Sequence, residues 1–359
     1  MYLGTQKHPL FIEMLIFLLN PLQEPTTLND ACTEFWHGGT MSGGNRWFDK
    51  SMQLLVTRNG KIAYQGEHSM LDAAPTIPVI RRILKTNYAR LAKKYSDQDW
   101  AAVTDEQVEG GVRNIFADCW SDHEVLTLVQ PTVEKAQKHH AIESNKFEIE
   151  AVQFTDFGKK QAKQWGLDGP LMAQMAIQLA GYRLFGKLVG CYEAASTRGF
   201  LHGRTETTRP VSPDTLAFVQ AMDNDKVSND EKLAALQAAY TTIAEYQAKA
   251  ASGLGVDRHL FGLSCMMEEG EYVPDLFADP LYQRAKTFRL STSSVIFTPG
   301  FGPVEEDGLG VAFNAEKDAF TFIITSRKVN NYAKPFSKLV EQSLQDLGAI
   351  LALEESDDQ

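Results

Sequence analysis

The dipeptide Asn59-Gly60 separates two strand-like runs and constrains how the chain folds between them. Apolar side chains recur at every second position from Met52, and the second run ends at Gly66. Asn-Gly is the dipeptide that best tolerates the left-handed conformations of a tight type I′ turn between antiparallel strands. The sequence therefore predicts a β-hairpin over residues 51–66.

A histidine, His68, follows the predicted hairpin, and a carboxylate, Asp72, stands four residues later. A histidine at a strand end can be held by its neighbours and still reach a cleft, and its ordinary pKa lets it accept and return a proton near neutrality. The Asp72 carboxylate is spaced to bond the second ring nitrogen and fix the tautomer. We interpret the pair as a general base and its orienting group. The alternative is an accident, since such spacings are common in a chain of 359 residues.

The length and charge of the chain limit its class and its partners. A chain of 359 residues, 43% hydrophobic and 23% charged, is typical of a globular protein with two or three domains. Its formal net charge of -11 argues against nucleic acid or an anionic membrane as a general partner, so an anionic ligand requires a local basic patch.

The cysteines and histidines do not suggest a metal centre. The four cysteines show no paired spacing, which favours a reducing compartment over a disulfide framework or a zinc site. The pair His139-His140 has no third ligand at metal spacing, and we expect it at the surface.

The run from Leu10 to Leu19 is strongly apolar. Glu13 interrupts it, and it is too short to span a bilayer. It also lacks the basic region and the small-residue cleavage site of a signal peptide. We therefore expect a buried helix, or a segment that packs against something absent from this chain, and no transmembrane segment.

Local signals mark helices in the second half of the chain. Asp168-Gly169-Pro170 is a good helix start, and it predicts a buried helix near 171–188, where nearly every side is apolar. Ser228 and Glu231 form a capping box at the start of a long helix. The other elements that we predict are two strands and a final helix, at residues 309–313, at residues 319–325 and from Pro335 onward.

Three lysines, Lys159, Lys160 and Lys163, crowd into five positions just before the helix near 171–188. Such a cluster can hold a phosphate group. The alternative is a solubilising loop, which these residues on their own favour.

Seven short motifs, taken together, resemble the carnitine/choline acyltransferase family. Their order and approximate separation match from about Trp36 to the last helix. The motifs are Asn45-Arg46-Trp47-Phe48-Asp49-Lys50, Gly66-Glu67-His68-Ser69, Tyr192-Glu193-Ala194-Ala195-Ser196, Gly203-Arg204-Thr205-Glu206-Thr207, Asp257-Arg258-His259-Leu260, Leu290-Ser291-Thr292-Ser293 and Phe301-Gly302-Pro303-Val304. The resemblance implies an α/β (α+β) fold with two chloramphenicol-acetyltransferase-like domains, whose mixed β-sheets are flanked by helices.

The resemblance covers only part of the family pattern, because family members are considerably longer and place their active-site tunnel between the two domains. It implies that residues 1–125 are the end of a truncated first domain that carries the histidine. Residues 126–359 are then the second domain, with the coenzyme A and carnitine contacts. It further implies a monomer, to which the missing N-terminal half is a candidate partner.

The reaction that the resemblance implies is a reversible transfer of an acyl group between coenzyme A and the hydroxyl of carnitine, without an acyl-enzyme. His68 is then the general base that takes a proton from the attacking hydroxyl or thiol, and Asp72 orients it. Ser293 matches the hydroxyl that donates to the negative oxygen of the tetrahedral intermediate, and Ser291 supports the same site. Coenzyme A is a substrate here, and no permanently bound cofactor is implied.

Five further positions match substrate contacts of the family. Tyr192, Thr205 and Arg258 match the residues that hold the carboxylate of carnitine. The choline branch has no carboxylate to bind and departs at the positions of Thr205 and Arg258, so the predicted acceptor is carnitine. Lys159 and Lys163 match the two lysines that meet the 3′-phosphate of coenzyme A.

Other positions depart from the family pattern. Asp168-Gly169-Pro170 replaces a Ser-Pro-Asp, and Ser294 replaces a glutamine. The segment from Val295 to Gly300 is shorter than in the acetyl-transferring members of the family, where it lies at the site that limits the length of the acyl chain. We predict acetyl or another short acyl group, with a medium-chain acyl group as the alternative. A second alternative is a catalytically silent fragment that binds only coenzyme A or a partner. The resemblance implies mitochondria or peroxisomes, and the cytoplasm stays open because no targeting signal is visible.

Overall fold

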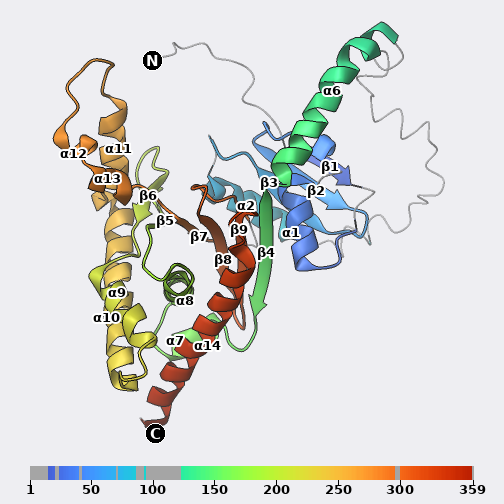
Figure 1. The fold of residues 1–359 in the computed structure, drawn as a ribbon. Coiled ribbons are helices and arrows are strands. Elements are labelled where there is room, and N and C mark those ends of the chain that lie inside the picture. Colours follow the sequence, from blue (N-terminus) through green and yellow to red (C-terminus); the bar gives the residue numbers. More distant parts are fainter. Residues whose placement is uncertain are drawn as a thin grey trace.

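The computed structural model describes residues 15–20, 24–39, 43–69, 72–85, 93, 123–295 and 300–357. Strands in these residues form two sheets, a three-stranded sheet in the order β1-β2-β3 and a six-stranded sheet in the order β4-β9-β8-β7-β5-β6. Helices flank both sheets (Figure 1). The predicted α/β class, with mixed sheets flanked by helices, is confirmed.

The three-stranded sheet and its helices lie before residue 86, and we call this part the N-terminal unit. Its elements are β1 (Leu15–Asn20), α1 (Leu28–His37), η2 (Gly43–Asn45), β2 (Met52–Thr57), β3 (Ile62–Gly66) and α2 (Ala73–Leu84). β1 runs parallel to β2, and β3 runs antiparallel to it. α1 begins with a capping box between Thr27 and Asp30.

The predicted hairpin is confirmed as β2 and β3, but its turn is not type I′. Gly60 has a φ of 75°, whereas Asn59 is not among the described residues with positive φ. The amide of Gly60 donates to the carbonyl of Thr57 at 2.9 Å, which indicates the three-residue loop that ends in a left-handed glycine. Either turn leaves His68 just beyond the second strand.

The helix expected at residues 10–19 is wrong for the part that the structure describes, because residues 15–20 form strand β1. This strand pairs in parallel with β2 along its whole length. A short continuous apolar run is typical both of a buried strand and of a buried helix. The spacing of apolar residues in the sequence therefore does not distinguish a strand from a helix here. Residues 10–14 lie outside the described residues.

The six-stranded sheet belongs to residues 123–357, which we call the C-terminal unit. Its strands are β4 (Phe147–Phe154), β5 (Cys191–Ser196), β6 (Thr205–Thr208), β7 (Leu290–Ser294), β8 (Leu309–Ala315) and β9 (Phe320–Arg327). Its helices are α6 (His123–Ser144), α7 (Lys159–Gln164), α8 (Gly169–Phe185), α9 (Pro213–Met222), α10 (Asn229–Lys249), η4 (Ala250–Leu254), α11 (Asp257–Cys265), α12 (Asp275–Ala278), α13 (Pro280–Ala285) and α14 (Ala333–Asp357). The predicted strand pair is confirmed as β8 and β9. The domain division after residue 125 stays a prediction, and it falls within α6.

Strand directions in the larger sheet are mixed. β7 runs parallel to its neighbours β5 and β8, and the other neighbouring strands are antiparallel. The polar run 291–294 therefore lies inside the sheet, on a strand with neighbours on both sides.

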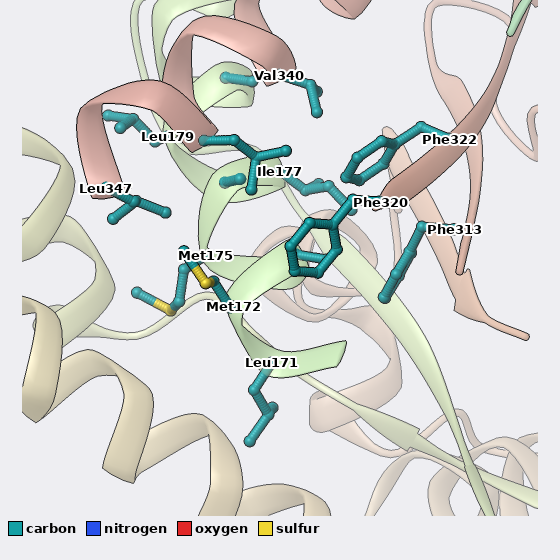
Figure 2. Packing of buried hydrophobic residues seen from close by; sticks show 14 of the residues in the cluster. Leu171, Met172, Met175, Ile177, Leu179, Phe313, Phe320, Phe322, Val340 and Leu347 are labelled. Atoms are coloured by element: carbon teal, nitrogen blue, oxygen red, sulfur yellow. The ribbon is translucent and has the colours of Figure 1, made fainter. Parts of the chain in front are cut away.

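Helix α8 is the centre of the main hydrophobic core. Asp168 caps it by accepting a hydrogen bond from a first-turn amide, and Pro170 stands in that turn. The helix packs against α10, α14 and β8, and its Met172 and Ile177 side chains are fully buried (Figure 2). Strands β8 and β9 and helix α14 also contribute large side chains to this core. These are Phe313, Phe320, Phe322, Val340 and Leu347. The predicted buried helix is therefore confirmed.

His140 connects the two units, although we expected it at the surface. Its Nε2 atom lies 2.9 Å from the His37 carbonyl oxygen, and its ring stacks on Phe48 at 5.3 Å between centroids. A side chain on Gly43 would collide with this ring, since a Cβ there would lie 1.9 Å from Nε2. Its neighbour His139 is exposed, as expected.

Two further findings apply to the described part of the chain. No helix there has both the length and the hydropathy of a bilayer span. Nor do three metal-ligating side chains gather anywhere in those residues.

Candidate functional site

Three of the predicted residues, Tyr192, Thr205 and Arg258, meet at one edge of the six-stranded sheet. The Nη2 atom of Arg258 donates to the Tyr192 hydroxyl at 3.2 Å and to the Thr205 hydroxyl at 3.4 Å. The guanidinium also lies 5.8 Å from the centroid of the Tyr192 ring. We call these residues the Arg258 cluster. A cation beside two hydroxyls can hold a carboxylate by charge-assisted hydrogen bonds.

Strand pairing explains how the Arg258 cluster is assembled. β5 and β6 are antiparallel neighbours, and Ala194 pairs with Thr207. Because side chains alternate between sheet faces, Tyr192 and Thr205 lie on the same face as that pair. β6 is the outer strand on this side, and α11 contacts it with Arg258 in its first turn.

Strand β7 adds both predicted serines to this face of the sheet. Ser291 is paired in register with Tyr192, and Ser293 lies two residues further along the same strand. Ser291 is buried and Ser293 is half-buried. Between them, the Thr292 hydroxyl donates to the Tyr192 carbonyl at 2.7 Å and ties β7 to β5.

The predicted base lies in the N-terminal unit, just beyond β3. The side chain of His68 is 76% exposed, and its Nε2 atom is 3.6 Å from Oδ1 of Asp72. That separation is too long for a hydrogen bond. The structure thus brings the two residues together without fixing the ring to the carboxylate.

The Asp72 carboxylate instead binds the guanidinium of Arg204. Its Nε and Nη2 atoms donate to the two carboxylate oxygens at 2.8 and 2.7 Å, and Nη1 donates to the Ser69 carbonyl at 3.2 Å. The hydrogen bonds from Arg204 are the largest cause that lowers the pKa of Asp72. Sequence reasoning missed this role, because no local pattern pairs two residues that are 132 positions apart.

The Asp72 carboxylate also links the two parts of the site electrostatically. Besides Arg204, the positive charge of Arg258 lowers the pKa of Asp72. A further hydrogen bond between the units in this region runs from Nη1 of Arg198 to the Ala74 carbonyl, at 3.3 Å. The histidine, its neighbouring carboxylate and the Arg258 cluster therefore belong to one region of the molecule.

The two predicted coenzyme A lysines lie elsewhere on the C-terminal unit. Lys159 and Lys163 are exposed on α7, which follows β4 at the opposite edge of the sheet from β6. Figure 1 shows α7 well separated from β5 and β6. The structure does not bring these lysines to the Arg258 cluster, so only a long ligand can contact both.

A buried carboxyl that sequence analysis did not single out lies next to β7. Glu193 on β5 is 4% exposed, and burial raises its pKa to about 7. The charge of Asp168 acts in the same direction, whereas a hydrogen bond with the backbone of Ser294 opposes it. Glu193 thus contacts the residue that follows Ser293. The available signal was a charged residue in a short strand whose alternate residues, Cys191 and Ala195, are buried.

Comparison with known proteins points to one family. A sequence model described as choline/carnitine O-acyltransferase matches residues 12–342. Carnitine O-acetyltransferase from Homo sapiens is 32% identical over 326 residues, which are 88% of this chain and 49% of that protein. Choline O-acetyltransferase from Sus scrofa is 32% identical over 333 residues, which are 89% of this chain and 50% of that protein.

A third relative is the mitochondrial carnitine O-acetyltransferase from Saccharomyces cerevisiae. It is 32% identical over 305 residues, which are 81% of this chain and 42% of that protein. The chain spans about half the length of the curated relatives it matches. Among solved structures, a chloramphenicol acetyltransferase overlaps 56% of this chain and 89% of its own, with a TM-score of 0.30 and 12% identity.

Proposed function

Because the chain belongs to the choline/carnitine O-acyltransferase family, we propose that it transfers a short acyl group reversibly between coenzyme A and the hydroxyl of carnitine. The observation that carries this proposal is the Arg258 cluster, in which the guanidinium donates to the hydroxyls of Tyr192 and Thr205. Carnitine has a carboxylate for this cation, and choline has none. The relatives include both carnitine and choline O-acetyltransferases, so the choice rests on the cluster.

In the proposed reaction, His68 takes the proton from the carnitine hydroxyl while the hydroxyl oxygen attacks the thioester carbonyl. The new C–O bond pushes the carbonyl electrons onto oxygen, and their return breaks the C–S bond. The departing thiolate then takes the proton back from His68. The exposed position of the His68 ring is compatible with both transfers.

Two groups stabilise the charges that develop during this reaction. Ser293 donates to the negative oxygen of the tetrahedral intermediate, and loss of one such donor typically costs about 10²-fold in rate. Ser291, buried on the same strand, supports it. Asp72 keeps its negative charge because Arg204 lowers its pKa, and this charge stabilises the imidazolium of His68.

We assign Lys159 and Lys163 to the 3′-phosphate of coenzyme A. Both are exposed on one short helix, and a chain with a net charge of -11 needs a local basic group for an anionic substrate. Coenzyme A acts here as a substrate and not as a resident cofactor. Acetyl is the proposed acyl group and a medium-chain group the alternative, and residues 296–299 of the relevant segment lie outside the described residues.

A mitochondrial or peroxisomal location is part of the proposal. The mitochondrial alternative is supported by the mitochondrial carnitine O-acetyltransferase among the relatives, and the peroxisomal alternative rests on the family resemblance alone. The monomeric state and the absence of a nucleic-acid partner remain predictions from the sequence.

The second candidate function is a catalytically silent chain that binds coenzyme A or a partner. Two observations favour it: the chain spans about half the length of its relatives, and the 3.6 Å between Nε2 of His68 and Oδ1 of Asp72 is too long for a hydrogen bond. A partner that supplies the rest of a family-length enzyme would then complete the site.

A thiol-release assay distinguishes the two functions. Purified chain, shown to be folded and monomeric by size-exclusion chromatography, is given acetyl-CoA with carnitine or with choline. Carnitine-dependent release that is lost in His68→Ala, but kept in His139→Ala, supports the acyltransferase. The control removes an exposed histidine of α6 that lies outside the site. No release from a folded chain contradicts the activity and favours the silent alternative, whereas release by His68→Ala contradicts the base.

A further inference from the structure

Helix α11, which carries Arg258, begins without a cap of its own. The residue before its first turn is Val256, which makes no side-chain capping bond. The first amides of a helix have no partner inside the helix, so an acceptor must come from elsewhere. Arg258 lies in the first turn, so the position of its backbone depends on that acceptor.

Glu206 on β6 supplies the acceptor. Its two carboxylate oxygens lie 3.2 and 3.4 Å from the backbone nitrogen of Arg258, and one of them also accepts from the amide of Thr207 at 2.6 Å. Glu206 is only 6% exposed. A buried carboxylate with charge-assisted bonds to a helix start is a strong local restraint.

A glycine just before α11, Gly255, leaves room for this carboxylate. A Cβ on Gly255 would lie 2.2 Å from Cγ of Glu206 and 2.6 Å from its Cδ. Glycine therefore allows the segment before α11 to approach β6 closely enough for the bond to form. This is a second observation, independent of the hydrogen bonds, that the Glu206 side chain and the start of α11 are fitted to each other.

Adjacent residues of β6 hold different parts of the same arginine. The Thr205 hydroxyl accepts from the guanidinium of Arg258, and the Glu206 carboxylate accepts from its backbone amide. Successive side chains of a strand point to opposite faces. The negative charge of Glu206 is thus kept off the face where the Arg258 cluster would meet an anionic ligand.

A separate ion pair anchors the rest of the helix start. Asp257 accepts from Nε of Arg209 at 2.9 Å in a two-pronged pair, and Arg209 also donates to the Ala285 carbonyl at 2.9 Å. Because this pair does not involve Glu206, α11 keeps one anchor when the Glu206 carboxylate is removed. The expected effect of that removal is therefore local to Arg258.

We propose that Glu206 is a positioning residue, which holds the backbone of Arg258 so that its guanidinium is preset for the carboxylate of the acyl acceptor. This inference rests on the proposed function. Glu206 does not touch the substrate, and it acts only through Arg258.

The kinetic test uses three substitutions of Glu206. Glu206→Ala removes the acceptor and should raise the KM for carnitine about tenfold, in line with the loss of a hydrogen bond to a charged group. Glu206→Asp keeps the charge but withdraws it by one methylene and should raise the same KM. Glu206→Gln keeps an acceptor oxygen at the same reach and should restore most of the affinity. The KM for acetyl-CoA should stay unchanged in all three, and kcat should change less than the carnitine KM.

Glu231→Ala is the matched control, because it removes a glutamate that caps a different helix, α10. Its carnitine KM should equal that of the wild type. If Glu206→Ala leaves the carnitine KM unchanged, or raises both substrate KM values equally, the positioning role is overturned. If Glu206→Ala does not fold, the comparison of Glu206→Gln with Glu206→Asp decides the question, and equal carnitine KM values for these two overturn the role.

Hydrogen exchange tests the same contact without any activity. The peptide that contains the first turn of α11 should exchange faster in Glu206→Ala and Glu206→Asp than in Glu206→Gln or Glu231→Ala. Unchanged exchange in Glu206→Ala overturns the inference even in an active enzyme. If the wild type shows no carnitine-dependent transfer, the proposed function fails, and the exchange comparison still decides whether Glu206 fixes Arg258.

Discussion

Arg204 and Asp72 form a two-pronged ion pair across the two units, with Nε and Nη2 of the arginine donating to the two carboxylate oxygens at 2.8 and 2.7 Å. A planar guanidinium matches a carboxylate in this geometry, whereas an ammonium group acts as a point charge. The same arginine donates to the backbone of Ser69, next to His68. Arg204 therefore restrains the peptide segment that carries the proposed base.

Arg204→Lys should lower kcat by about tenfold, because it keeps the charge but loses the fork that orients Asp72. Arg204→Ala should lower kcat further. The measurement is steady-state transfer between acetyl-CoA and carnitine. Arg198→Ala is the matched control, since Arg198 also bridges the units, through the Ala74 carbonyl, but does not contact Asp72. Equal losses in Arg204→Ala and Arg198→Ala would show that only the contact between the units matters.

Local signals predicted helices α8 and α10 well, because each begins where its capping residue stands. Asp168 and Ser228 accept the first-turn hydrogen bonds that the sequence indicates. A cap and the residues that it serves are neighbours in the chain, so this information is local. The apolar run at Leu15 lacked such a signal, and its pairing with the distant strand β2 decided its structure.

The site shows the same division between local and distant information. The resemblance to a family named Tyr192, Thr205 and Arg258, and the structure brings them together. The partners Arg204 and Glu206 stood in the same motif, yet their roles depend on contacts with residues 132 and 52 positions away. Such contacts follow from how strands and units meet, which no periodicity in the sequence encodes.

The buried Glu193 makes stability depend on pH in a specified direction. Its pKa rises from the ordinary 4.5 to about 7 in the folded chain, mainly because burial disfavours the charged form. Between these values the folded chain binds more protons than the unfolded chain, so this group lowers the free energy of unfolding as the pH rises from about 4.5 to about 7. The full effect of such a shift is on the order of 3 kcal/mol.

Glu193→Gln removes that titration while keeping an oxygen for the Ser294 backbone. The variant should match the wild type near pH 4.5 and exceed its free energy of unfolding near pH 8, by up to about 3 kcal/mol. Urea unfolding at the two pH values gives the comparison. Glu245→Gln is the control, because this glutamate is 65% exposed in a surface pair with Lys249. A difference between Glu193→Gln and wild type that is the same at both pH values would contradict a raised pKa.

Arg258→Asn separates the carnitine site from the coenzyme A site. The substitution removes the cation that donates to the Tyr192 and Thr205 hydroxyls, so the KM for carnitine should rise by at least tenfold, as for loss of a charge-assisted hydrogen bond. The KM for acetyl-CoA should hardly change. The KM for choline, which has no carboxylate, should not rise. The preference for carnitine over choline should therefore shrink.

The matched control for Arg258→Asn is Arg284→Asn, in the last turn of α13 and outside the Arg258 cluster. It makes the same change of charge, so it accounts for the long-range field of one arginine. A rise in the carnitine KM in both variants would assign the effect to net charge and not to contact. An unchanged carnitine KM in Arg258→Asn would remove Arg258 from the carboxylate site, and the choice of carnitine over choline would lose its structural support.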